Sequence, residues 1–304
     1  MHCYPFTIFT PTYNRAHTLP MLKTSLEKQD VCGFEWLIID DGSVDETQDI
    51  VEEWKKEDLP FDIHYHKVTN GGKPRAINKA CSLAMSEWMY IVDSDDQLVP
   101  NTLGYVVDKI AEIADDASFV GVGFLRGHKD GIPLGIVLFE DYVDATNLQR
   151  RDYGLDFDCN EIYRVSVLRK FPFVVWKNEK FSPEEIVLNE MALHGYKLRW
   201  YNKICVYSEY LEDGMTKGAS DLVRNNPMGY AMMFNHRLKY SRGLSDMFMN
   251  ACQFIALCFC SGCISYVAKC NKPWVAVLAM PVGVLLGIRR CQQFKTASKT
   301  QVSS

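Results

Sequence analysis

Short apolar runs alternate with amphipathic stretches along roughly the first hundred residues of the chain. The apolar runs end in turn residues and predict strands at residues 6–9, 34–40, 61–68 and 88–92. The stretches between them repeat apolar residues at helical spacing and predict helices at residues 18–29, 44–57 and 73–86. Strands separated by single helices favour a mostly parallel α/β sheet with helices on both faces.

Polar clusters follow three of the predicted strands directly. They are "PTYNR" (11–15), "DDGSVDET" (40–47) and "DSDD" (93–96). In an open α/β sheet, ligands bind beyond the carboxyl ends of the parallel strands. We therefore expect these three clusters to lie close together and to form the binding site.

The third cluster places three aspartates within four positions, where their like charges repel. Alternate residues of an extended chain point the same way, so Asp93 and Asp95 can face one pocket together. A hard divalent cation, Mg²⁺ or Mn²⁺, that carries a diphosphate would relieve this repulsion. Capping of a helix that begins near Pro100 by Asp95 or Asp96 is the alternative explanation.

Four motifs resemble, in this order and spacing, those of the family 2 glycosyltransferases. They are "FTPTYNR", "LIIDDGSVDET", "NGGKPRAIN" and "VDSDDQLVP". Three later segments are similar to those of bacterial members that build surface polysaccharides: "EIYRVSVLRKFPF", "EKFSPEE" and "YLEDGMT". The resemblance covers about residues 5–217.

This resemblance implies a fold and a reaction. The fold is the GT-A (Rossmann-like) α/β fold, with a mixed sheet and helices on both faces. The reaction is the metal-dependent, inverting transfer of a sugar from a nucleotide-sugar, here a UDP-sugar, to a saccharide or lipid-linked acceptor. The alternative function is that of a non-catalytic nucleotide-sugar-binding protein or membrane scaffold.

The resemblance also assigns the donor and the metal to particular residues. Donor binding falls to Pro11, Thr12, Tyr13, Asp40, Asp41, Lys73, Asp93 and Ser94, and metal binding to Asp93 and Asp95. Asp41 matches the aspartate that accepts a hydrogen bond from the base, and Lys73 offers a point charge to the phosphates. Tyr13 as a partly buried plug and Asp41 or Ser43 as a helix cap are the structural alternatives.

An inverting transfer requires a carboxylate that removes the proton from the acceptor hydroxyl. The resemblance points to Glu184, directly after Pro183, with Glu185 as the next candidate. Stabilisation of a helix N-terminus would explain an acid at this position without catalysis. Asp158 and Glu161 are expected on the acceptor side.

The C-terminal part of the chain is basic and apolar. Residues 214–304 contain eleven Lys or Arg but only two Asp and no Glu. Residues 247–268 are long enough to span a bilayer, and the second apolar segment, residues 273–288, is marginal. Because Lys269 and Lys272 lie between them, a shallow or re-entrant pair on an anionic membrane surface is favoured over a full hairpin. Packing on the catalytic domain or at a dimer interface is the alternative.

The expected organisation is a catalytic domain followed by a membrane-associating helical region. Residues 1–100 form the nucleotide-sugar half and residues 101–215 the acceptor half of the catalytic domain, with the helical region at 216–304. No signal peptide is recognised, so we expect the chain at the cytoplasmic face of the cell membrane. Scattered single cysteines indicate reduced thiols, and no nucleic-acid partner is expected.

Overall fold

The computed structural model describes residues 4–208 and 219–302, which form two compact units. Unit 1 comprises the described residues 4–173 and 187–208, and unit 2 comprises residues 174–186 and 219–302. The segment 174–186 therefore belongs with the C-terminal helices, whereas the predicted division at residue 215 assigns it to the catalytic domain.

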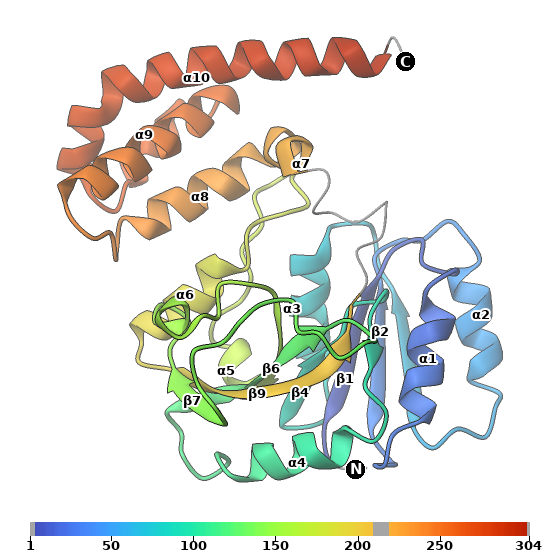
Figure 1. Cartoon of the computed structure of the whole chain (residues 1–304). Helices are drawn as coiled ribbons and strands as arrows, with labels where there is room; N and C mark the ends of the chain where they lie inside the picture. Colours follow the sequence, from blue (N-terminus) through green and yellow to red (C-terminus); the bar gives the residue numbers. More distant parts are fainter. Residues whose placement is uncertain (1–3, 209–218, 303–304) are drawn as a thin grey trace. The chain divides into compact units, whose positions relative to one another are not determined.

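The described part of unit 1 is built on a mixed sheet in the order β3-β2-β1-β4-β8-β6-β9-β5, with β7 paired to β9 (Figure 1). Its strands are β1 (Thr7–Thr12), β2 (Glu35–Asp40), β3 (Asp62–Lys67), β4 (Trp88–Ile91), β5 (Gln97–Leu98), β6 (Phe119–Gly127), β7 (Tyr142–Ala145), β8 (Cys159–Arg164) and β9 (Lys197–Tyr207). The first four strands are mutually parallel, as the sequence predicts. Strand β8 runs antiparallel to β4 and β6, which makes the sheet mixed.

Helices cover both faces of this sheet, which confirms the predicted α/β class. One face packs against α1 (Leu19–Glu27), α2 (Thr47–Trp54) and α4 (Leu103–Ala111). The other face packs against α3 (Lys73–Leu83), α5 (Val165–Leu168) and α6 (Glu185–Leu193), and a short 3-10 helix, η1, spans Arg150–Tyr153. Strands β1 and β2 are buried on both faces under these helices, whereas the edge strand β3 is polar and partly exposed.

Unit 2 contains the helices α7 (Ala219–Asn225), α8 (Pro227–Arg237), α9 (Leu244–Cys260) and α10 (Pro273–Val302), together with the 3-10 helix η3 (Ile264–Lys269). Figure 1 shows α9 and α10 side by side. The Cys252 thiol points to the carbonyl of Ala279 and the Cys260 thiol to that of Gly287, so contacts advance in the same direction along both helices. The two helices are therefore parallel and do not form a hairpin.

The apolar segment 247–268 is not one long helix, so the prediction that it could span a bilayer is wrong. Helix α9 ends at Cys260, because Gly262 adopts a left-handed conformation with φ of 70°. The amide of Cys263 then donates to the carbonyl of Cys258, which closes a Schellman-type turn. Within the described residues, one helix is long and apolar enough to cross a membrane, and this is the 22-residue stretch Pro273–Phe294 of α10.

Candidate active site

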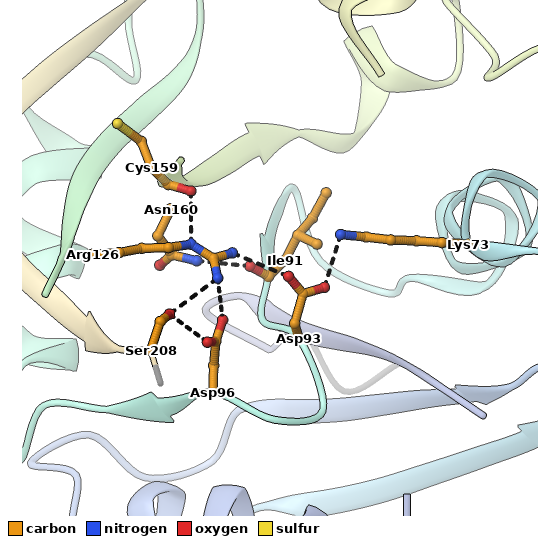
Figure 2. Close-up of polar contacts among 8 residues, drawn as sticks. All are labelled: Lys73, Ile91, Asp93, Asp96, Arg126, Cys159, Asn160 and Ser208. Carbon is orange, nitrogen blue, oxygen red and sulfur yellow. Dashed lines mark hydrogen bonds and ion pairs between the residues drawn. The ribbon is translucent and has the colours of Figure 1, made fainter. Parts of the chain in front are cut away.

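The predicted polar clusters lie at the carboxyl ends of β1, β2 and β4, which are neighbours in the sheet. The start of α3, which follows β3, belongs to the same edge, because its Lys73 reaches the residue that follows β4. The ends of β6 and β9 add two residues, Arg126 and Ser208 (Figure 2). The sequence thus predicts the position of this site, although not all of its members.

Asp93 lies between two cations. Its Oδ1 atom lies 2.8 Å from Nζ of Lys73, and its Oδ2 atom lies 3.2 Å from Nη2 of Arg126. Figure 2 shows the two basic side chains approaching the carboxylate from opposite directions. The positive charge expected beside the aspartates is thus supplied, in part, by the protein itself.

Arg126 also binds the last aspartate of the cluster. Its Nη1 atom lies 2.5 Å from Oδ2 of Asp96, and its Nε atom donates to the carbonyl of Cys159 at 3.0 Å. The other oxygen of Asp96 accepts a hydrogen bond from the hydroxyl of Ser208. These contacts fix the guanidinium of Arg126 between β4, β8 and β9.

The aspartate segment turns instead of continuing as an extended chain. The amide of Asp96 donates to the carbonyl of Asp93 at 3.1 Å, and Ser94 and Asp95 occupy the turn. The prediction of an extended chain across Asp93 and Asp95 is therefore wrong. Asp95 is half exposed and makes no hydrogen bond or ion pair with any residue that the structure describes. Its proposed role as a metal ligand stays a prediction.

Helix capping does not explain the aspartates. The amides of Thr102 and Leu103, at the start of α4, donate to the side-chain oxygen of Gln29. The next amide, that of Gly104, donates to Asp30. The N-terminus of α4 is therefore satisfied by residues that follow α1, which leaves the cluster available for another purpose.

The pKa values of Asp93 and Asp96, the two carboxylates that contact Arg126, shift in opposite directions. Burial opposes the ionisation of Asp93, but the charges of Lys73 and Arg126 outweigh it and hold the pKa of Asp93 below its usual range. Burial raises the pKa of Asp96 to about 7; Arg126 opposes this shift, and the negative charge of Asp93 adds to it. Asp93 is therefore the permanent anion of the pair.

Asp41 links the loop after β2 to the start of α3. Its two oxygens accept hydrogen bonds from the amides of Gly71 and Gly72, at 2.7 and 2.8 Å. Gly42 follows with φ of 84°, and a Cβ atom there would lie 3.1 Å from the amide nitrogen of Asn70. The capping alternative for Asp41 or Ser43 at α2 is not observed, because the first amide of α2, that of Thr47, donates to the carboxylate of Asp45 at 3.1 Å.

Asp40 is fully buried at the end of β2. It accepts hydrogen bonds from the amide of Ser43, at 2.7 Å, and from the hydroxyl of Tyr65. Burial and this bond raise the pKa of Tyr65 well above its usual value. These two hydrogen bonds show that Asp40 holds the turn after β2, in which Asp41 lies.

The end of β1 provides one exposed ring and one unpartnered hydroxyl. Pro11 and Thr12 are buried, and the hydroxyl of Thr12 has no hydrogen-bond partner among the described residues. Tyr13, by contrast, is 47% exposed. A buried hydroxyl without a partner costs free energy. A ligand that bonds to the Thr12 hydroxyl would remove this cost, so the end of β1 is suited to binding one.

The residues present fit a hard divalent cation that is shared with a substrate. Asp93 is ionised, and the half-exposed Asp95 offers a second oxygen donor, whereas Mg²⁺ takes one or two protein carboxylates and completes its shell with water and phosphate. No group of three or more possible ligands occurs among the described residues, so an all-protein metal cage is not formed there. His64, which could bind a metal by its residue type, pairs instead with Glu35, and its Nδ1 atom lies 2.9 Å from Oε1 of that residue.

The predicted general bases lie in unit 2. Glu184 is half buried in the turn after Pro183, and α6 begins one residue later. Glu185 forms a two-point ion pair with Arg237, with N–O distances of 2.7 and 2.6 Å. Glu179, the first acid of the same motif, binds the amides of Met228 and Gly229 at the start of α8.

The remaining acids have separate locations. In unit 1, Asp158 is exposed, and Glu161 lies 3.7 Å from Arg150. The acids Glu212 and Asp213 of the "YLEDGMT" segment lie outside the described residues. The acceptor-side roles of Asp158 and Glu161 therefore stay predictions.

Two residues of the site, Arg126 and Ser208, lie outside the sequence motifs, and the pairing of Asp96 with Arg126 is not predicted by them. Arg126 ends the apolar run "FVGVGFL", so a charge at the carboxyl end of a buried strand was the available signal. Asn160 also reaches this region, since its Nδ2 donates to the carbonyl of Ile91 while its buried Oδ1 has no partner in the described chain. No signal in the sequence distinguishes Ser208.

A protein-family model described as "Glycosyl transferase family 2" matches residues 7–171. Poly(ribitol-phosphate) beta-N-acetylglucosaminyltransferase TarS of Staphylococcus aureus is 28% identical over 207 residues, which cover 67% of this chain. The match covers 34% of TarS, so the chain spans about a third of that relative. A PGL/p-HBAD biosynthesis glycosyltransferase of Mycobacterium bovis is 33% identical over 116 residues, 38% of this chain and 41% of the relative.

Solved structures confirm the predicted GT-A fold. The crystal structure of S. aureus TarS 1–349 in complex with UDP-GlcNAc has a TM-score of 0.61 at 20% identity, covering 97% of this chain and 92% of that chain. The mannosyltransferase PcManGT from Pyrobaculum calidifontis, in complex with GDP-Man and Mn²⁺, has a TM-score of 0.54 at 14% identity. That match covers 99% of this chain and 84% of the mannosyltransferase.

Proposed function

Because the chain belongs to glycosyl transferase family 2, we propose that it is an inverting glycosyltransferase of polysaccharide synthesis, acting on a saccharide or lipid-linked acceptor. The observation that carries the proposal is the ion-paired site at the carboxyl ends of β1, β2 and β4, where Lys73 and Arg126 flank Asp93. A UDP-sugar is the favoured donor, since TarS has been solved with UDP-GlcNAc and with UDP.

The nucleoside of the donor is assigned to the ends of β1 and β2. Exposed Tyr13 offers a ring for a base or ribose, and the unpartnered hydroxyl of Thr12 offers a hydrogen bond. Each oxygen of Asp41 accepts one amide bond and retains a lone pair for a base N–H. These groups would fix the base relative to the β4 turn.

The diphosphate is assigned to the β4 turn. Lys73 and Arg126 provide fixed positive charge, with Lys73 held by its ion pair with Asp93. Asp93 and Asp95 would hold a divalent cation, which supplies positive charge for the leaving diphosphate when it is bound. Ser94, buried within the same turn, would hold the backbone between these two carboxylates.

Glu184 is the favoured general base. The choice follows the position of this acid directly after Pro183 in the "EKFSPEE" segment, to which the family resemblance points. Glu185, the next candidate, is held by a two-point pair with the guanidinium of Arg237, and a carboxylate held in this way is a weaker proton acceptor. Glu184 is therefore the group that would remove the acceptor proton during the displacement.

The basic, apolar C-terminal part supports a site of action at the cytoplasmic face of an anionic membrane, where a lipid-linked acceptor would be found. A non-catalytic nucleotide-sugar-binding protein or scaffold is the competing function.

Two measurements on the full chain separate these functions. A panel of nucleotide-sugars is first tested for thermal stabilisation with and without Mn²⁺, and we expect UDP-sugars to raise the Tm most when Mn²⁺ is present. Release of free nucleoside diphosphate is then followed with and without candidate acceptors. Acceptor-dependent release supports the transferase; stabilisation without any release supports the scaffold, and no stabilisation contradicts both.

A further inference from the structure

The face of α10 that points away from α9 is an apolar ridge. Its exposed large side chains share one side of the helix and are Trp274, Val277, Leu278, Val282, Leu285 and Ile288. We call this set the α10 ridge. At 1.5 Å per residue it is about 21 Å long. Solvent-exposed apolar patches of this extent mark surfaces that bind another component.

The opposite face of α10 is already occupied by α9. It carries small residues, and a Cβ atom at Gly283 would lie 2.7 Å from Cβ of Ile255. A Cβ atom at Gly287 would lie 2.9 Å from Cβ of Phe259. The helix axes therefore approach closely, and any side-chain growth on this face would separate them. Among the described side chains of α10, those of the ridge remain exposed to a partner.

The charge around the ridge identifies the kind of partner. Residues 247–304 contain six Lys or Arg and no Asp or Glu. Lys269 and Lys272 precede the ridge, exposed Arg289 continues it at the other end, and Arg290 is tied to Gln253 of α9 at 2.7 Å. An apolar strip flanked by positive charge at both ends complements the surface of an anionic bilayer. Two copies of the ridge would bring like charges together.

The packing of unit 2 excludes a simple spanning arrangement of α10. Helix α9 runs parallel to it and has 17 residues, about 26 Å, with Asp246 in its first turn. Asn250 of α9 is buried and bonded to Asp246 and Ser241. If α10 crossed the bilayer along its axis, α9 with its buried Asn250 would enter the hydrocarbon with it, and so would α8, which packs on α9.

We infer that the α10 ridge binds an anionic lipid bilayer with α10 lying in the plane of the surface, while α9 stays outside the hydrocarbon. The ridge enters the boundary between head groups and acyl chains, typically about 5–10 Å deep, and the flanking Lys and Arg contact the phosphates. The inference rests on the proposed function only for its purpose, which is to bring the transferase to a lipid-linked acceptor.

Vesicle flotation of the full chain tests the inference. We expect binding to vesicles that contain phosphatidylglycerol and much weaker binding to pure phosphatidylcholine vesicles. The double variant Val277→Glu/Leu285→Glu should lower the partition coefficient about tenfold or more, since two charges replace inserted apolar groups. Ile136→Glu, at an 82% exposed apolar position of unit 1, is the matched control and should bind as the unmodified chain does.

The depth of insertion distinguishes lying in the surface from spanning. In a Trp274→Phe background, Val282→Trp places a tryptophan in the middle of the ridge. We expect lipids brominated near the head group to quench its added fluorescence more than lipids brominated near the chain ends. Strongest quenching by the deep label would overturn the inference in favour of a spanning helix.

Two further outcomes would also contradict it. One is equal vesicle binding by the double variant. The other is a concentration-dependent dimer, measured by sedimentation without lipid, that the double variant abolishes while the unmodified chain fails to bind vesicles. Because flotation needs neither donor nor acceptor, failure of vesicle binding leaves the transferase proposal intact, and absence of turnover leaves the vesicle result intact.

Discussion

Nη2 of Arg126 lies 3.2 Å from Oδ2 of Asp93, which joins the end of β6 to the residue that follows β4. The charge of Asp93 is thereby compensated within the protein, with Lys73 on its other oxygen. A diphosphate that enters this site meets two fixed cations as well as the carboxylates that would share a metal with it.

Removal of Arg126 should destabilise the fold and weaken donor binding together. Arg126→Met removes the cation that the buried Asp96 shares with the partly exposed Asp93, so the free energy of unfolding should fall by on the order of 3 kcal/mol. Urea unfolding measures this loss. Lys56→Met is the control: Lys56 and Glu53 form an exposed pair, and its removal should change stability by about 0.5 kcal/mol or less. If Arg126→Met lowered the free energy of unfolding as little as Lys56→Met does, Arg126 would not have this structural role.

Asp95 and Asp93 should respond differently to neutralisation. Asp95→Asn should keep the stability of the fold, because Asp95 has no partner among the described residues, yet remove most of the Mn²⁺-dependent binding of UDP. Asp93→Asn should lower stability as well, because Lys73 and Arg126 then face each other without the anion. Calorimetric titration of UDP with and without Mn²⁺, alongside urea unfolding, checks both. Unchanged metal-dependent binding in Asp95→Asn would remove Asp95 from the site.

The raised pKa of Asp96 predicts a specific pH dependence of stability. Its folded-state pKa of about 7 exceeds the usual value of 3.8 for an aspartate, so folding favours the protonated form. This contribution is fully present below about pH 4 and is lost as the pH rises through 7. Asp96→Asn mimics the protonated side chain, so its stability relative to the unmodified chain should increase between these two pH values. Urea unfolding of both proteins measures this difference. If the free energies of unfolding of Asp96→Asn and of the unmodified chain differed by the same amount at every pH in this range, the raised pKa of Asp96 would be refuted.

Neutralisation of Glu184 and of Glu185 should have different effects on turnover. Glu184→Gln should preserve UDP-sugar affinity while turnover falls by roughly 10²-fold or more, because general-base assistance is lost. Glu185→Gln breaks the pair with Arg237 and should lower stability with a smaller effect on turnover. Turnover and urea unfolding are measured on both variants. A larger turnover loss in Glu185→Gln would transfer the role of base to Glu185.

The parts of the structure that local patterns determine are the ones that the sequence predicts. Strand β2 at Glu35–Asp40 and helix α3 at Lys73–Leu83 lie within their predicted ranges, since burial and helical spacing act over a few neighbouring residues. The ends of the parallel strands meet as expected, because topology requires it. The meeting of the three polar clusters at one edge of the sheet was therefore predictable.

The missing parts depend on contacts between distant residues. Arg126 reaches Asp93 from 33 residues away, through the position of β6 in the sheet, which no local pattern encodes. The end of α9 within the segment 247–268 could not be predicted either. The segment is apolar throughout, and the helix ends because Gly262 adopts a left-handed conformation. The turn at Asp95 likewise depends on a backbone bond between Asp96 and Asp93.

The location of bound nucleotide tests the central claim most directly. Crystals of the full chain grown with UDP and Mn²⁺ would give an anomalous difference peak for Mn²⁺ and density for the diphosphate. We expect the peak beside the carboxylates of Asp93 and Asp95, with the diphosphate between it and Lys73. A nucleotide bound away from the carboxyl end of β4, or a Mn²⁺ peak without either aspartate as a ligand, would contradict the account.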